Sequence, residues 1–131
     1  MDKLIELGLS SNDIENMILL NPMIKFLNFE EIESNISILE NIQCENRHIK
    51  NILITNPFYL TRSIDDIEKL INKLLSLGLT NLNLLFDANP FFLNLDSFEI
   101  DEFIKEKQKD DMLLVDIIDL IDSNPYIFDM I

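Results

Sequence analysis

The dipeptide Asn-Pro recurs at a nearly constant interval, and this recurrence constrains the fold more than any other feature of the chain. It stands at Asn21-Pro22, Asn56-Pro57, Asn89-Pro90 and Asn124-Pro125, which together hold all 4 prolines of the 131 residues. Successive prolines are 35, 33 and 35 residues apart. A period of this size is typical of repeat proteins, in which each unit is one supersecondary element stacked on its neighbour. We therefore predict a single domain over residues 1–131, built from about three to four repeats in units of approximately 1–27, 28–62, 63–95 and 96–131.

Apolar residues recur at the same offsets before every proline. They stand eight, five and four residues before it, which is the spacing of one face of a helix. All twelve positions are apolar: Ile14, Met17, Ile18, Ile49, Ile52, Leu53, Leu82, Leu85, Phe86, Ile117, Leu120 and Ile121. Because proline disfavours the helical conformation in the residue before it, each Asn should end its helix. We then expect the Asn to cap a short helical turn that begins with proline.

A second helix is predicted after each of the first three prolines. Residues that favour helix N-caps stand six positions after the proline, and acidic residues stand three positions further on, as in a capping box. These pairs are Asn28 with Glu31, Ser63 with Asp66, and Asp96 with Glu99. Two antiparallel helices cannot bury their shared face alone, so neighbouring units must stack. The predicted fold is an all-α superhelical solenoid with two antiparallel helices and one short Asn-Pro helical turn in each repeat.

The chain has only two glycines, Gly8 and Gly78, and both follow a predicted helix. Glycine just past a helix end adopts the left-handed conformation without a Cβ clash. Glycine this scarce also argues against a hairpin-rich β fold, whose turns need residues with positive φ.

The pattern resembles the mitochondrial transcription termination factor family, the mTERF repeat proteins. The family's Leu-Gly-Leu-Ser motif is similar to Leu7-Gly8-Leu9-Ser10 and Leu77-Gly78-Leu79-Thr80, each followed by an apolar helix, the proline and two apolar residues. The second unit departs from it with Asn41-Ile42-Gln43-Cys44, and the fourth unit has no glycine. The resemblance implies a curved helical solenoid with a basic concave groove that binds DNA or RNA.

The charge of the chain disfavours that groove. The formal net charge is −14 and the sequence pI about 4.2, so the field repels polyphosphate and attracts basic partners. The stretch 45–75 is near neutral, and it holds the cations that a nucleic-acid site would use: Arg47, Lys50, Arg62, Lys69 and Lys73. The alternative is that these cations form a solvated face with local ion pairs.

Candidate catalytic and metal-binding residues are few. His48 and Cys44 are the only histidine and cysteine, and a zinc site needs about four ligands. The acidic pairs Glu30-Glu31, Asp65-Asp66 and Asp110-Asp111 are each predicted in a first helical turn, where negative charge offsets the helix dipole. We expect no enzyme activity, no metal and no cofactor.

Two further features each have two interpretations. The aromatic residues after the prolines, Phe58-Tyr59, Phe91-Phe92 and Tyr126, could stack on bases, but their fixed place in each unit favours the core. The acidic C-terminal helix is predicted to contain Asp110, Asp111, Asp116, Asp119 and Asp122 with apolar residues between them, and it suits either a polar capping helix or a docking surface.

The expected function is a non-catalytic helical-repeat binding module. The charge favours a protein-interaction scaffold with a basic partner, and the alternative is an mTERF-like nucleic-acid-binding protein. The N-terminal stretch lacks the pattern of a signal or transit peptide, and no apolar run reaches the ~18 residues of a membrane span. We therefore expect a cytoplasmic location.

Overall fold

The computed structural model describes residues 2–130, with side chains as far as Phe128, and these residues contain helices but no strand. The prediction of an all-α fold is confirmed. In chain order the elements are α1 (Asp2–Glu6), α2 (Ser11–Leu20), η1 (Pro22–Phe26), α3 (Phe29–Asn41), α4 (Asn46–Thr55), η2 (Pro57–Thr61), α5 (Ile64–Ser76), α6 (Leu82–Ala88), η3 (Pro90–Asn94), α7 (Ser97–Lys109), α8 (Leu114–Ser123) and η4 (Ile127–Met130), where η denotes a 3₁₀ helix.

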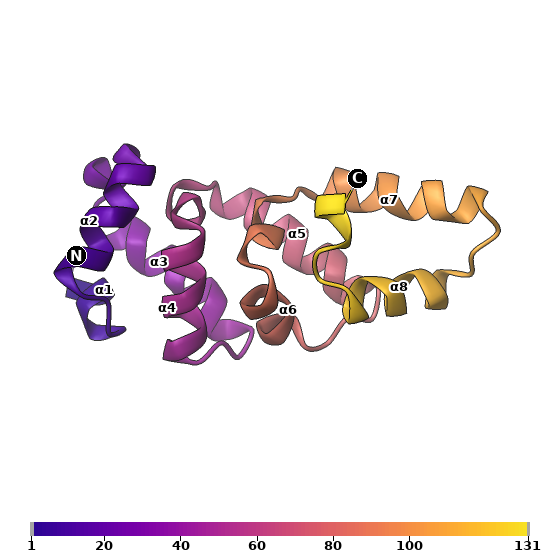
Figure 1. Cartoon of the computed structure of the whole chain (residues 1–131), viewed down its shortest axis with the longest axis horizontal. Helices are drawn as coiled ribbons and strands as arrows, with labels where there is room; N and C mark the ends of the chain where they lie inside the picture. The colour runs from indigo at the N-terminus through magenta and orange to yellow at the C-terminus, as the bar shows by residue number, and fades with distance from the viewer. Residues whose placement is uncertain (1, 131) are drawn as a thin grey trace.

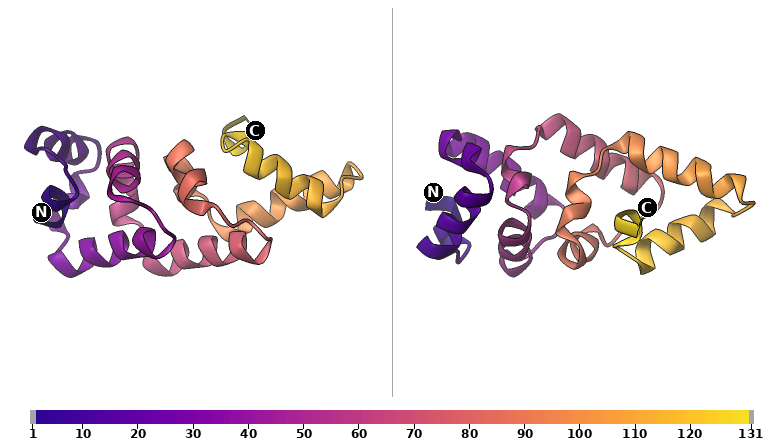
Figure 2. Two further views of the ribbon diagram at one scale, coloured as in Figure 1. Left: turned by 90° about the horizontal axis from the view of Figure 1, so that it is seen from below. Right: turned by 45° about the horizontal axis from the view of Figure 1, so that its top comes forward.

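The helices form an elongated array of two layers (Figures 1 and 2). One layer contains α2, α4 and α6, which pack in sequence, and the other contains the long helices α3, α5 and α7, with α1 against α3. The 3₁₀ helices η1, η2 and η3 also contact one another in sequence. At the far end, α7 and α8 form a hairpin (Figure 1). Each unit therefore contributes one helix to each layer.

The apolar stripe predicted before each proline forms much of the core. Ten of its twelve members are buried, and the other two, Ile18 and Leu120, are half-buried and pack against the core. The long helices complete the core with residues such as Ile36, Leu70 and Ile100. The two layers are therefore joined by one continuous apolar cluster.

The turns after α1, α3, α5 and α7 each contain one residue in the left-handed conformation. Gly8 and Gly78 have φ of 96° and 100°, and the corresponding residues Gln43 and Asp111 have φ of 71° and 64°. The residue after each donates its N–H to the carbonyl five residues earlier, as Cys44 does to Leu39 at 3.1 Å. This is the Schellman motif, which satisfies the last carbonyls of a helix. The second and fourth units thus keep the turn without its glycine.

The predicted helix caps are correct in two of three places. Asn28 with Glu31 and Asp96 with Glu99 form reciprocal capping boxes. The prediction for Ser63 is wrong, because its side chain makes no cap hydrogen bond. Ser10 and Asp13 form a further box at α2, and the hydrogen bonds from the backbone and side chain of Ser10 lower the pKa of Asp13.

Two of the three acidic pairs lie where they were predicted. Glu30-Glu31 and Asp65-Asp66 lie in the first turns of α3 and α5. Asp110-Asp111 instead lies in the turn between α7 and α8, and the prediction that it begins a helix is wrong.

Candidate functional site

The asparagines of the Asn-Pro dipeptides join successive units. The side-chain Nδ2 of Asn21 donates to the carbonyl of Pro57 at 3.3 Å, that of Asn56 to Pro90 at 3.0 Å, and that of Asn89 to Pro125 at 2.9 Å. Each of these three asparagines, Asn21, Asn56 and Asn89, therefore reaches the proline carbonyl of the next unit. The prediction that it caps its own turn is wrong for Asn21 and Asn56, which make no such bond. It holds for Asn89, whose side chain also accepts from the N–H of Phe91 at 3.2 Å.

A second polar link is buried between α3 and η2, and the sequence analysis missed it. Asn35 is 3% exposed, and its Nδ2 donates to the carbonyl of Leu60. In return the hydroxyl of Tyr59 donates to the carbonyl of Asn35 at 2.5 Å, and burial raises the pKa of that hydroxyl. The sequence did contain a signal for this link: Asn35 is a polar residue in the apolar stripe of α3, and the equivalent residue of α5 is the apolar Leu70.

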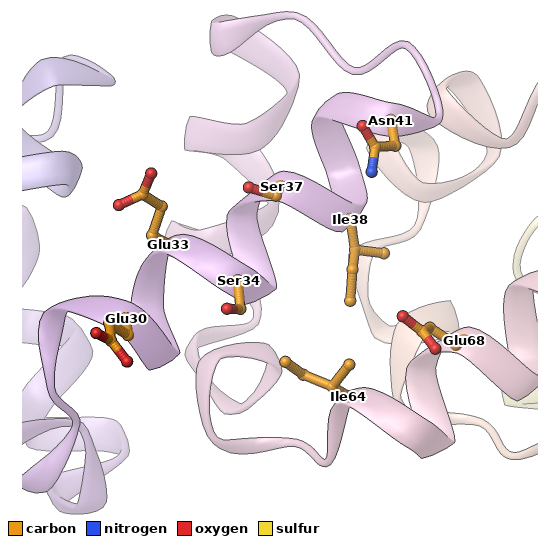
Figure 3. A pocket seen from close by; sticks show the side chains of 8 residues that line it. All are labelled: Glu30, Glu33, Ser34, Ser37, Ile38, Asn41, Ile64 and Glu68. Carbon is orange, nitrogen blue, oxygen red and sulfur yellow. The ribbon is translucent and has the colours of Figure 1, made fainter.

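The junction of α3 and α5 forms a hollow on the surface of about 570 Å³, which we call the acidic groove (Figure 3). Ile38 of α3 and Ile64 of α5 point toward one another across the gap between the two helices (Figure 3). Polar side chains from both helices surround them. The full lining is Glu30, Glu33, Ser34, Ser37, Ile38, Asn41, Ile64 and Glu68.

All charged side chains that line the acidic groove are negative. Three of its eight lining side chains, Glu30, Glu33 and Glu68, are carboxylates, and none is basic. A second hollow of about 210 Å³ shares Ile38, Asn41 and Glu68 and continues along α5 to Asn72. The two hollows therefore lie side by side and share one carboxylate, that of Glu68. Such a surface attracts cationic groups and repels phosphate.

The five predicted cations do not gather into one patch. Arg47 and Lys50 belong to α4 in one layer, whereas Lys69 and Lys73 belong to α5 in the other. Arg62 lies at the junction of η2 and α5. The five cations are therefore distributed over both layers and the junction between them.

Most of these cations also have intramolecular partners. The Nε of Arg47 lies 3.1 Å from Oε2 of Glu45, and the Nζ of Lys73 lies 2.9 Å from Oδ1 of Asp101 on α7. The guanidinium of Arg62 donates to the carbonyl of Leu93. Lys69 is exposed and has no ion pair among the described residues. The local ion pairs expected from the alternative interpretation are therefore found for two of the five.

The aromatic residues after the prolines divide between core and surface. Tyr59 and Phe92 are buried, as predicted for core residues. Phe58, Phe91 and Tyr126 are 48%, 45% and 49% exposed, so the prediction is wrong for them. A 3₁₀ helix has three residues per turn, so Phe58 and Phe91 face outward while the two residues after each of them are buried. The hydroxyl of Tyr126 donates to the carbonyl of Ala88 at 2.6 Å.

Cys44 and His48 are both buried and lie close to the start of α4. The Nδ1 of His48 accepts from the N–H of Glu45 at 3.1 Å, which places the histidine in the cap of that helix. Burial raises the pKa of the Cys44 thiol to about 12, which leaves it protonated and unreactive at neutral pH. Within residues 2–130, no group of three or more His, Cys, Asp or Glu side chains is placed to hold a metal ion.

Stacked helix pairs joined by proline-led 3₁₀ turns define an α-helical repeat protein. The family model described as mTERF matches residues 1–109, so the chain belongs to the mTERF family. No curated protein and no solved structure matches it. Among the described residues, no helix combines the length and the apolar character that crossing a membrane requires.

Proposed function

We propose that the protein is a non-catalytic interaction module that binds a basic segment of a partner protein in the acidic groove. The observation that carries this proposal is the lining of that groove, with three carboxylates and no basic side chain. Charge complementarity of this kind determines the choice of partner and the rate of association.

The groove also indicates what the bound segment looks like. Ile38 and Ile64 are its two apolar lining side chains, while Ser34, Ser37 and Asn41 offer hydrogen-bonding groups. An amphipathic helix places apolar residues on one face and basic residues at its edges. We therefore expect a short helix rich in Lys or Arg as the ligand.

The test uses a labelled synthetic amphipathic helix of Lys and Leu, titrated with the protein by fluorescence anisotropy. The double change Glu33→Lys with Glu68→Lys should weaken binding by about tenfold or more, because it reverses two charges of the groove. The matched control is Glu6→Lys with Glu15→Lys, which changes the net charge equally at exposed positions outside the groove. An equal loss of affinity in both variants would mean that binding depends only on the net charge of the protein, and the proposal would fail.

Nucleic-acid binding is the second candidate, and family membership favours it. Titration of labelled duplex DNA, single-stranded DNA and RNA at about 50 and 200 mM salt distinguishes the two, because phosphate contacts release counterions. Binding that weakens steeply with salt and is abolished by Lys69→Glu with Lys73→Glu would support this second candidate. Our proposal predicts no binding at either salt concentration.

A further inference from the structure

The outward face of α7 carries a groove that differs from the acidic groove, and we call it the terminal groove. Its volume is about 380 Å³, and its apolar part is formed by Leu95, Phe98, Phe103 and Phe128. Phe98 is 66% exposed. Glu106 lies at the edge of this groove. Four apolar side chains therefore line one groove, and contiguous exposed apolar surface is a feature of interaction sites.

The corresponding faces of the other long helices are covered. The face of α3 packs against α5, and the face of α5 packs against α7. At the acidic groove, Ile64 in the first turn of α5 faces Ile38 of α3 across the gap between the two helices (Figure 3). In the second pair, Lys73 of α5 forms its ion pair with Asp101 of α7 at 2.9 Å. Within residues 2–130, no long helix follows α7 to cover its face in the same way.

The repeat places equivalent residues at these junctions. Counted from the proline of each unit, Ile64 stands seven residues after Pro57, and Asp101 stands eleven after Pro90. Lys73 stands sixteen after Pro57, and the residue sixteen after Pro90 is Glu106. A helix packed on α7 should therefore meet the carboxylate of Glu106 at the position where α7 itself meets the ammonium group of Lys73 on α5.

We propose that the terminal groove binds a helix of a partner protein that has an apolar residue in its first turn and Lys or Arg four residues later. The apolar residue takes the place that Ile64 has on α3 and packs beside Phe98. The basic residue takes the position that Asp101 of α7 has beside Lys73 of α5. Its own partner is Glu106, so the cation and the carboxylate of this ion pair change places. This inference uses a different site from the proposed function and does not depend on it.

The other charged groups near the groove leave Glu106 as the available carboxylate. Glu99 accepts from the N–H of Asp96 in its capping box, at 3.4 Å. Glu102 lies 3.8 Å from Lys105, and the ammonium of Lys107 lies 5.4 Å from the ring centroid of Phe103. Glu106 is exposed and has no ion pair among the described residues.

A second copy of this chain does not meet these requirements. The residue eleven after the proline is Glu33 in α3, Glu68 in α5 and Asp101 in α7. Each long helix would therefore place a carboxylate against Glu106. The net charge of −14 adds a repulsion between copies. The charge at the groove selects a partner of opposite sign.

The test uses two labelled peptides with the sequence of residues 57–76, which contains the whole of α5. One has the natural Glu68 and the other has the change Glu68→Lys, so that the lysine follows Ile64 by four residues. We expect the wild-type protein to bind the lysine peptide about tenfold more tightly, as for a close charge pair. The variant Glu106→Lys should reverse this preference.

Three controls keep the result specific. Phe98→Ala should weaken binding of the lysine peptide, and because Phe98 is exposed, the fold should survive the change. Glu15→Lys on α2 should leave the preference as it is in the wild type. Glu33→Lys with Glu68→Lys in the protein should also leave it unchanged, which separates this site from the acidic groove. The same preference in wild type and Glu106→Lys would overturn the inference.

Discussion

Gln43 and Asp111 occupy turn positions where the other two units have glycine. Their φ angles of 71° and 64° lie in the left-handed region, where a side chain costs roughly 1–2 kcal/mol relative to glycine. Two hydrogen bonds recur in all four turns: the left-handed residue donates to the carbonyl three residues earlier, and the next residue donates to the carbonyl five residues earlier. The second and fourth turns therefore hold a small strain.

Replacing Gln43 by glycine should relieve that strain. We expect Gln43→Gly to raise the free energy of unfolding by about 1 kcal/mol, as measured by urea denaturation. Gly78→Ala should lower it by a similar amount, since a Cβ at Gly78 meets no atom within 4 Å and only the backbone conformation is penalised. A Gln43→Gly variant less stable than wild type would contradict this explanation.

The asparagine link between units predicts a larger effect at Asn56. This residue is 0% exposed, and its Nδ2 donates to the carbonyl of Pro90 and to Oδ1 of Asn94 at 2.9 Å. Asn56→Ala leaves the Pro90 carbonyl without this bond and should cost about 2 kcal/mol. Asn94→Ala removes only the exposed partner and should cost less than half as much. Equal costs in urea denaturation would argue against the link through Pro90.

The buried thiol of Cys44 predicts a pH dependence. Its pKa is about 12 in the folded protein and 9.0 when unperturbed. The unfolded chain therefore loses this proton first, so the contribution to stability is fully present below pH 9 and falls as pH rises toward 12. Melting temperatures between pH 8 and 11 should fall less steeply in Cys44→Ala than in wild type. Parallel curves would show that Cys44 does not contribute.

At the scale of single elements, helix boundaries follow from local chemistry wherever the cap is formed. The reciprocal boxes at Asn28 and Asp96 could be predicted because donor and acceptor lie within four residues of one another. Ser63 has the right residue type, but its backbone, at φ −58° and ψ 132°, leaves the side chain without a cap bond. The adjacent Arg62, held by the Leu93 carbonyl, belongs to the same junction.

This difference gives a paired prediction for the caps. Asp96→Ala should lower the free energy of unfolding by about 1 kcal/mol, because it removes the acceptor for the N–H of Glu99 at 2.8 Å. Ser63→Ala should change it by less than about 0.5 kcal/mol. Thermal or urea denaturation of the two variants checks this order. A larger loss at Ser63 would show that it caps α5 in solution.

At the scale of the whole molecule, the net charge of −14 is the dominant electrostatic feature. Self-repulsion destabilises a compact state, and salt screens it over a Debye length of about 10 Å at 0.1 M. We expect the melting temperature to rise between about 20 and 500 mM NaCl, as measured by calorimetry. The variant with Glu6→Lys and Glu15→Lys should show a smaller rise. A melting temperature that falls with salt would indicate that attractive ion pairs dominate instead.

The sequence by itself determined the fold class, the repeat and most of the core. Helical periodicity, proline and the residues that cap or end helices act over a few positions, so the four Asn-Pro dipeptides and the apolar stripe were sufficient. They could not predict where the Asn21 and Asn56 side chains point, because their partners are 36 and 34 residues away. The same holds for Asn35 and Tyr59, which lie 24 residues apart and on different elements of one unit.

The location of the charges was likewise decided by the tertiary structure. The cations from Arg47 to Lys73 are neighbours in sequence, but the fold places them in two layers and pairs several of them. Glu30, Glu33 and Glu68 are spread over two helices, and only the packing of α3 on α5 brings them to one groove. A surface site depends on which faces of separate helices meet, and local sequence carries little information about that.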